Sequence, residues 1–237
     1  MLIVLAWHQI LNKPHATSID LFINQIKFLK KEFDILSEPI FKLGTIQLLL
    51  TFDDATFDFF LNVYPILKEE NIFATLGIPT FWIQNQSNLD NNFRLNLLNS
   101  KNPFYSKDCF CSWNELKILQ SSNIIKFASH GHHHFNIKYN PNIKELITPL
   151  KQIKTNLDVI PKSFIFPYGA YNKSLLPALK ENYKYLFRIG SASNLIPKNT
   201  FIYRVIVDNL ENISSLFTKK SISTLIGKEV LNRIRFY

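Results

Sequence analysis

Cysteine is nearly absent from this sequence: Cys109 and Cys111 are its two cysteines, and one residue separates them. A C-x-C pair suits neither an ordinary disulfide nor a zinc site with four protein ligands, so we expect both thiols to be reduced and structural. Glycine (6) and methionine (1) are also scarce, yet no window is of low complexity and no repeat recurs at a fixed period. The sequence therefore indicates neither a linker nor a repeat protein.

A long hydrophobic run is missing from the N-terminus. The segment MLIVLAWHQI has six apolar residues between Met1 and His8, with no basic region before them and no small-residue cleavage site after them. Such a run is too short for a signal peptide or a membrane span. We therefore expect a cytoplasmic protein, with a peripheral position at the inner face of the membrane as the alternative.

Charged residues make up 19% of the chain and hydrophobic residues 46%, which over 237 residues gives enough apolar material for one substantial core. We therefore expect a single domain over 1–237. The formal net charge of +9 favours an anionic partner. Nucleic acid is not the expected partner, because the lysines are scattered and no nucleic-acid recognition motif accompanies them.

Apolar runs alternate with amphipathic segments along the chain. Residues 2–7 form a continuous apolar run, typical of a strand buried on both faces, and the next segment, which Ser18 can cap, repeats its apolar residues every three or four positions like a helix. The same pattern predicts further strands at 46–52, 72–78, 124–129, 163–167, 184–189 and 202–207, and helices near 57–70, 113–121, 142–157 and 173–181. Such alternation predicts parallel strands joined by right-handed crossovers, and thus an α/β fold, a single-domain, TIM-like deformed (β/α)7 barrel.

Two segments depart from this rhythm. Residues 81–112 are rich in Asn and Gln without a sustained period, so we expect a surface loop insertion. Its aromatic residues Trp82, Phe104 and Tyr105 could stack on a sugar, although loop aromatics more often anchor the loop. Residues 209–237 predict a C-terminal helical segment with basic residues among apolar ones: either the closing helix of the barrel or an amphipathic element that contacts an anionic membrane.

The polar residues that could catalyse a reaction or bind a metal follow the predicted strands. His8 follows the first, Asp53 and Asp54 the second, the run SHGHHHFN the fourth, and Pro167-Tyr168-Gly169 the fifth. The carboxyl ends of parallel barrel strands meet at one mouth, so we expect these side chains to converge. Adjacent carboxylates repel unless a cation or separate roles divide them, and imidazole with carboxylate is a usual zinc set. A metal site is predicted; the alternatives are a solvated turn at the aspartates and a polar histidine-rich turn.

Three motifs carry a resemblance to a known family. LLLTFDDA resembles the TFDD motif of the polysaccharide deacetylases (the NodB homology domain of carbohydrate esterase family 4), FASHGHHH resembles their S-H-x-x-x-H motif, and FPYGAYN a common form of their third motif. VLAWHQI, FATLGIP and SWNELKIL extend the resemblance in order over most of residues 1–207. The ordered set is far more specific than any one motif.

The resemblance implies a metal-dependent hydrolase that removes an N-acetyl or other acyl group from a sugar or glycan. It implies that Asp54, His130 and His134 hold one divalent metal ion, expected to be Zn²⁺, and that Asp53 is the general base toward a metal-activated water. It also implies that the Tyr168 backbone N–H, after Pro167, stabilises the oxyanion together with the metal. We expect an acetylated sugar, lipid-linked or nucleotide-linked, used in assembly of cell-surface polysaccharide.

The sequence departs from the family pattern at several positions. Ala55 stands where Gly is usual, and Ile165 where many members have the Arg that orients the base; Arg204 is our candidate replacement. No histidine follows His134, so the usual C-terminal general acid is missing. We predict that His8 supplies it, since its pKa is near neutrality; the alternative is a buried histidine that satisfies a core hydrogen bond. The remaining two histidines of the run are expected to lie behind the ligands or to face solvent.

Two other functions stay open at this point. A related metal hydrolase acting on another non-peptide C–N bond would use every residue named above. An inactive glycan-binding homologue is favoured by the missing acid and by Ile165, but the intact Asp53 argues against it, because a binding protein needs no base beside a metal ligand.

Overall fold

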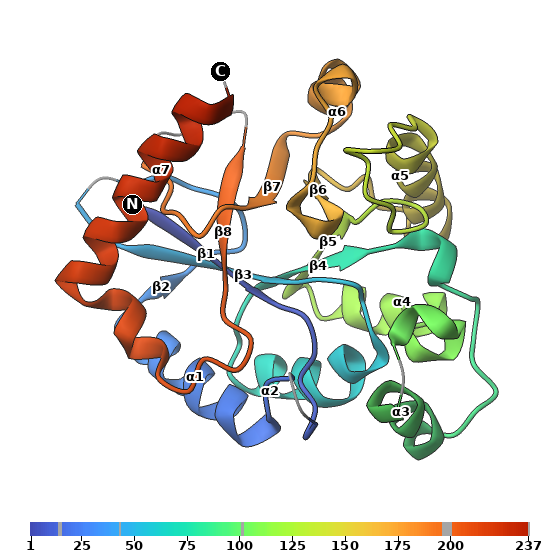
Figure 1. The fold of residues 1–237 in the computed structure, drawn as a ribbon. Helices are drawn as coiled ribbons and strands as arrows, with labels where there is room; N and C mark the ends of the chain where they lie inside the picture. The colour runs from blue at the N-terminus through green and yellow to red at the C-terminus, as the bar shows by residue number, and fades with distance from the viewer. Residues whose placement is uncertain (14–15, 43, 101, 196–200, 237) are drawn as a thin grey trace.

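Parallel pairing joins seven strands into a closed ring (Figure 1). The computed structural model describes residues 1–13, 16–42, 44–100, 102–195 and 201–236. Around the ring the order is β1-β8-β7-β6-β5-β4-β3, and β3 closes it by pairing with β1. The ring strands are β1 (Leu2–Trp7), β3 (Gln47–Phe52), β4 (Ala74–Ile78), β5 (Ile125–Ser129), β6 (Ser163–Ile165), β7 (Tyr185–Ile189) and β8 (Ile202–Ile206). The predicted parallel (β/α)7 barrel is confirmed.

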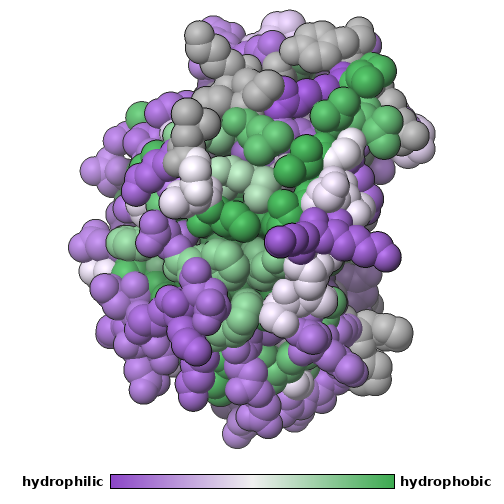
Figure 2. All heavy atoms as spheres, turned by 90° about the vertical axis from the view of Figure 1, so that its left-hand side faces the viewer, coloured by the Kyte–Doolittle hydropathy of each residue, from purple (hydrophilic) through white to green (hydrophobic). Residues whose placement is uncertain are grey.

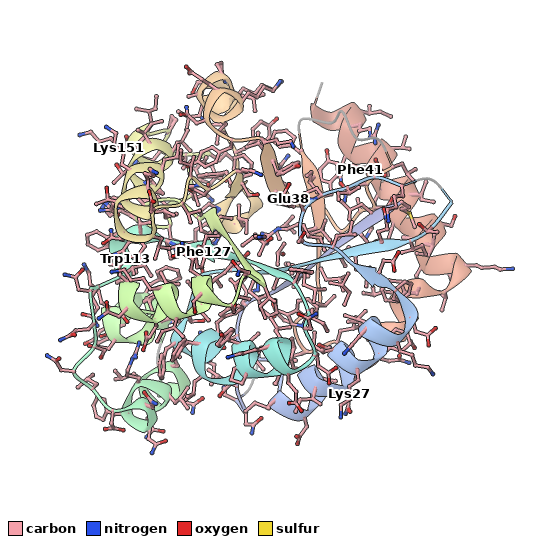
Figure 3. The ribbon with its side chains drawn as sticks, turned by 180° about the vertical axis from the view of Figure 1, so that it is seen from behind. Lys27, Glu38, Phe41, Trp113, Phe127 and Lys151 are labelled. Atoms are coloured by element: carbon pink, nitrogen blue, oxygen red, sulfur yellow. The ribbon has the colours of Figure 1, made fainter. Side chains whose placement is uncertain are left out.

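The barrel is deformed between β3 and β4. All six residues of β3 pair with β1, but only its last two, Thr51 and Phe52, pair with β4. At the beginning of β3, the side that faces β4 pairs instead with β2 (Asp34–Ile35). Figure 3, seen from behind, shows Glu38 and Phe41 in the segment that joins β2 to β3, and Phe41 packs against the cluster inside the barrel. The segment after β2 therefore helps to close the end of the barrel that holds the amino ends of the strands.

The continuous apolar runs arise because both faces of a barrel strand are buried. In β1, Leu2 and Val4 point into the barrel, whereas Ile3 and Leu5 pack outward in the large cluster that includes helical side chains. All six residues of β1 and all six of β3 are buried. Successive side chains of such a strand point alternately into the barrel and toward the helices, and both environments are apolar. The sequence therefore shows no alternation of apolar and polar residues.

Helices surround the ring (Figure 1). Ser18 caps α1 (Ile19–Glu32) as predicted, since its side chain accepts from the backbone N–H of Leu21. The others are α2 (Tyr64–Glu69), which follows a π-helical turn (Phe59–Val63), α4 (Trp113–Ser121), α5 (Lys144–Leu157), α6 (Leu176–Asn182) and α7 (Lys219–Phe236). Among the described residues, none of the helices is long and apolar enough to cross a membrane.

The predicted loop over 81–112 is wrong in its secondary structure. It contains the helix α3 (Asn91–Ser100) and the short 3-10 turns Thr80–Trp82, Pro103–Tyr105 and Lys107–Cys109. Arg94, which is buried, holds α3 to the rest of the segment: its guanidinium pairs with Glu115 and donates to the carbonyl oxygens of Asp108 and Phe110. Tertiary contacts of this kind stabilise a helix whose own sequence is weakly amphipathic. Cys109 and Cys111, at the end of the segment, are free and buried.

Candidate active site

The barrel alternation places four polar side chains at the mouth. His8, Asp53, His130 and Arg204 each stand an even number of residues after an inward-facing apolar residue of the same strand: Leu2 and Val4, Leu49, Ala128 and Ile202. A period of two therefore directs all four toward the barrel axis at or beyond the carboxyl ends of their strands. All but Arg204 line a pocket of about 490 Å³ at this end. The predicted convergence of these residues is thus present in the structure.

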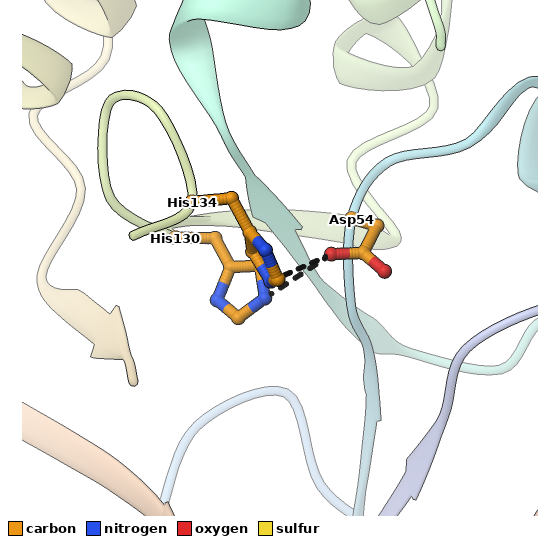
Figure 4. A group of neighbouring side chains, drawn as sticks. All are labelled: Asp54, His130 and His134. Carbon is orange, nitrogen blue, oxygen red and sulfur yellow. Dashed lines mark ion pairs between the residues drawn. The ribbon is translucent and has the colours of Figure 1, made fainter. Parts of the chain in front are cut away.

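His130 forms a compact group with two further side chains of this pocket, Asp54 and His134 (Figure 4). Asp54 Oδ1 lies 3.3 Å from His130 Nε2 and 3.2 Å from His134 Nε2. Donor atoms about 2.0–2.1 Å from one tetrahedral ion lie roughly 3.3–3.4 Å apart, close to both separations. Asp54 Oδ1 is also buried without a hydrogen-bond partner among the described residues. A buried orphan oxygen facing two imidazole nitrogens fits a divalent cation, so these residues form a candidate metal site.

The two imidazoles are held in a ligand-competent form. His130 Nδ1 donates to the carbonyl oxygen of Ile165 at 2.9 Å, so that Nε2 is the ring nitrogen that faces Asp54. Burial lowers the pKa of His134 to about 4, so that ring is neutral at pH 7. The ring of Phe104 stacks on His134 at a centroid distance of 4.4 Å, which fixes the plane of the imidazole.

Asp53 is held by a buried bidentate ion pair. Arg204 Nη1 donates to Oδ1 at 2.6 Å and Nη2 donates to Oδ2 at 2.9 Å; Arg204 is fully buried and Asp53 is 4% exposed. Burial alone would raise the pKa of Asp53, but the charge of the guanidinium reverses this and holds the pKa well below its usual range. Asp53 is therefore an ionised carboxylate at the mouth. This arginine lies on β8. It is the residue that the sequence offers in place of the arginine that many members of the resembled family have where this chain has Ile165.

His8 faces Asp53 across the mouth. Its Nδ1 donates to Asp208 Oδ2 at 2.6 Å, its backbone N–H donates to Asp208 Oδ1 at 2.9 Å, and its Nε2 lies 3.7 Å from Asp53 Oδ2. Burial would lower the pKa of His8, but the Asp208 hydrogen bond and the charge of Asp53 outweigh it and raise the pKa to about 9. The imidazole is therefore protonated at neutral pH. With 39% of its side chain exposed, it is not the buried core histidine of the alternative interpretation.

Asp208 was missed by the sequence reasoning, although a signal existed. It follows β8 by two residues, as Asp54 follows β3. The polar residues predicted to meet at the mouth follow the first, second, fourth and fifth predicted strands. Asp208 follows the strand predicted at 202–207 and therefore meets the same criterion.

Family comparison agrees with this geometry. The model of the family described as polysaccharide deacetylase matches residues 42–185. The chain belongs to the polysaccharide deacetylase family. A curated relative, the poly-β-1,6-N-acetyl-D-glucosamine N-deacetylase of Staphylococcus aureus (strain MRSA252), is 27% identical over 188 residues, covering 71% of this chain and 59% of the relative. This deacetylase-family chain thus spans about three fifths of the length of the curated relatives it matches.

Solved structures share the fold of this deacetylase-family chain. IcaB from Ammonifex degensii superposes with a TM-score of 0.71 at 18% identity, covering 88% of this chain and 92% of that one. A de-N-acetylase from Aggregatibacter actinomycetemcomitans gives a TM-score of 0.72 at 17% identity, covering 95% and 99%. At these identities the likeness establishes the barrel and not the substrate.

Backbone conformation explains one departure of this deacetylase-family chain from the family pattern. Ala55 has φ of +50°, and Asp54, His134 and Tyr168 have φ of +70°, +63° and +58°. The left-handed region costs a non-glycine residue about 1–2 kcal/mol, which is why glycine is usual where Ala55 stands. Strained backbone of this kind clusters at functional sites. Four such residues in the three deacetylase motifs bend the chain sharply where it leaves the strands.

The third deacetylase motif forms a tight turn after β6, Pro167–Gly169. A Cβ on Gly169, whose φ is +64°, would lie 2.9 Å from Ile189 Cβ, so only glycine fits there. The ring of Tyr168 lies 4.8 Å from that of His134, between centroids. The turn thus places Tyr168 in the pocket lining, beside His134 of the candidate metal site.

The segment 81–112 supplies one wall of the pocket. Asn102, Pro103 and Phe104 line it. Trp82 instead anchors the segment, because its ring stacks on Phe110 and lies edge-on to Phe104. Tyr105 is 71% exposed and is not part of the pocket lining.

Proposed function

We propose that this chain is a metal-dependent deacetylase that hydrolyses the N-acetyl group, or a similar acyl group, of a sugar or glycan. One observation carries the proposal: a candidate metal site, an ionised carboxylate and a protonated imidazole share a single pocket. The carboxylate is Asp53, held by Arg204, and the imidazole is His8, held by Asp208. A base and an acid with opposite charges at neutral pH are what amide hydrolysis needs at its two proton transfers.

Asp54, His130 and His134 would hold the metal, and we propose zinc because two imidazoles and one carboxylate are a common catalytic zinc set. A bound divalent ion lowers the pKa of water and polarises the acyl carbonyl. Asp53 accepts the proton of the attacking water, since its carboxylate is ionised and is held in place by Arg204. The backbone N–H of Tyr168 donates to the oxygen that becomes negative; one such donor is typically worth about 10²- to 10³-fold in rate.

His8 completes the reaction as general acid. When the C–N bond breaks, the sugar nitrogen takes a proton from His8 Nε2, and the acyl group leaves as acetate with the oxygen of the water. Asp208 keeps the other ring nitrogen protonated and holds the imidazole in place, with Nε2 directed toward Asp53. A histidine supplied by the N-terminal strand would replace the C-terminal acid that the sequence lacks.

We propose an acetylated glycan, with poly-β-1,6-N-acetylglucosamine as the first candidate. The support is the name of the Staphylococcus aureus relatives, 27% identical, together with a pocket that has aromatic rings at its wall, Phe104 and Tyr168. A lipid-linked or nucleotide-linked acetylated sugar is the alternative substrate of the same chemistry. Both substrates would present an N-acetyl group to the same metal ligands, base and acid.

The test is acetate release from poly-β-1,6-N-acetylglucosamine, measured with and without chelator. We expect release that a chelator stops and that zinc restores, and its loss in Asp53→Asn with the metal still bound. A related C–N hydrolase would release no acetate from any acetylated sugar while other amide substrates turn over. An inactive homologue would bind the glycan and release nothing at any metal loading.

We also propose a peripheral contact between α7 and an anionic membrane. Val230, Leu231 and Ile234 of this helix are 52%, 54% and 69% exposed, and Lys228 lies two residues before Val230. Figure 2 shows the corresponding face, on which hydrophobic side chains gather in a band between hydrophilic ones. An amphipathic helix with basic residues binds such surfaces. Flotation with vesicles containing phosphatidylglycerol should be lost in Ile234→Asp; unchanged flotation would remove the proposal.

A further inference from the structure

The turn that carries His134 is built against one buried carboxylate. Glu145, in the first turn of α5, is 1% exposed. Its Oε2 accepts the backbone N–H groups of His132 and His133, each at 2.9 Å, and its Oε1 accepts from His133 Nδ1 at 2.6 Å. A buried carboxylate with three donors is a strong, directional anchor.

The position of His134 depends on this turn more than that of His130 does. His130 directly follows β5, and its ring is fixed by the Ile165 carbonyl. His134 comes four residues later, beyond Gly131 with φ of +75°, and itself has φ of +63°. Such a conformation persists only where the surroundings enforce it. The separation between the two imidazoles is therefore set by how residues 131–133 are held.

The opposite side of the turn is held by the 3-10 turn Thr80–Trp82, which follows β4. The backbone N–H of Thr80 donates to Gly131 O at 3.3 Å, and that of Phe81 donates to His132 O at 2.9 Å. The Thr80 hydroxyl also lies 2.9 Å from His132 Nδ1. Contacts from the 3-10 turn Thr80–Trp82 on one side and from α5 on the other thus enclose the turn.

We propose that Glu145 is a positioning residue that sets the metal affinity of the site, with His133 as its side-chain partner. The inference rests on the metal site of the proposed function. It also assigns the two histidines between the ligands: His132 holds the turn to the segment Thr80–Trp82 and His133 holds it to α5, and neither ligates metal. Glutamine is an incomplete substitute for Glu145, because its amide can keep the two backbone bonds but presents N–H groups to His133 Nδ1.

Glu229 is a matched control for Glu145. It is equally buried, at 1% exposed, lies on a helix, and likewise accepts from a loop, through Leu195 N and Ser193 Oγ. That loop pairs with Leu2 through Asn194, at the end of β1 opposite His8. Loss of Glu229 should therefore destabilise the fold without changing the geometry of the mouth.

The experiment measures the zinc dissociation constant of the full chain by competition with a chromogenic chelator, and the visible spectrum of the Co²⁺-loaded protein. We expect Glu145→Ala to bind zinc about 10- to 100-fold more weakly and to alter the Co²⁺ bands, as loss of supporting contacts around metal ligands does elsewhere. Glu145→Gln should show a smaller loss, within about tenfold. Glu229→Ala should lower the melting temperature and leave the zinc affinity within about twofold.

Zinc affinity within twofold of wild type and unchanged Co²⁺ bands in Glu145→Ala, with a lower melting temperature, would overturn the inference and leave Glu145 a structural residue. If Glu145→Ala does not fold, Glu145→Gln decides the question by the same two readouts. Wild-type protein that binds zinc but releases no acetate from the glycan would remove the proposed function, while the ratio of affinities would still decide the role of Glu145. Wild-type protein without zinc affinity would overturn both.

Discussion

Replacing Arg204 with methionine separates the charge of the Asp53 pair from its packing. The methionine side chain fills much of the space of the arginine stem, so the main loss is the guanidinium that pairs with Asp53. Both partners are buried and the pair is bidentate, at 2.6 and 2.9 Å. Removing one partner of a buried ion pair costs about 3–5 kcal/mol, because the other charge is left unpaired. We expect a loss of that size in the free energy of unfolding at pH 7.

The pH dependence of this loss has a definite sign. In the wild type the pKa of Asp53 lies below that of the unfolded chain, about 3.9, so its stabilisation is complete above that pH and is lost as the pH falls below it. In Arg204→Met, burial acts unopposed and raises the pKa, so the penalty is present at neutral pH and relieved on acidification. The difference in unfolding free energy between wild type and variant should therefore be largest at pH 7 and shrink toward pH 4.

Urea unfolding at pH 7, 5 and 4, in EDTA to keep metal out of the comparison, measures this difference. Asp53→Asn and the double variant complete a cycle, and removing both partners should cost less than the sum of the single losses by about 2 kcal/mol or more. Losses that add to within about 0.5 kcal/mol and do not change with pH would refute the argument that charge pairing dominates.

Three further predictions concern the pocket. Asp208→Asn replaces the charged acceptor whose hydrogen bond helps to raise the pKa of His8 to about 9 with a neutral amide. The pKa should fall, and because an acid must be protonated, the basic limb of the pH profile of kcat/KM should move to lower pH; an unmoved limb would argue against His8 as the acid. Phe104→Ala should raise KM for the glycan about three- to tenfold, roughly the worth of one aromatic contact, whereas Tyr105→Ala, outside the pocket lining, should leave KM unchanged. Equal changes of KM in the two variants would exclude a specific role of Phe104 at the pocket wall. Zinc at 100 times its Kd should stabilise the wild type by about 2.7 kcal/mol, seen as a rise in melting temperature that Asp54→Ala lacks; a rise in both would place the binding elsewhere.

The barrel could be predicted because its strands carry a simple signal. Residues 2–7 are apolar throughout, and 46–52 are apolar except for Gln47 and Thr51, since both faces of these strands are buried. The same signal predicted where Asp53, His8 and the histidine run would meet, because polar residues directly after such strands share one mouth. Arg204 was expected from the missing arginine at Ile165, and it lies 2.6 Å from Asp53.

The remainder depends on contacts that no local pattern contains. The helix α3 is stabilised by Arg94 and its distant partners, and β2 is too short to show a period. Glu145 reads as an ordinary charged residue near a helix start, and its burial follows from the turn that packs over it. Asp208 comes directly after the strand predicted at 202–207, and its partner His8 lies 200 positions away in the sequence.

Metal content, measured by elemental analysis of the purified wild type and of Asp54→Ala and His134→Ala, is the most direct test of a metal-dependent site. The account predicts about one zinc or other divalent ion per chain in the wild type, lost in both variants. No metal in the wild type, even after incubation with zinc, or an equal content in all three proteins, would contradict it.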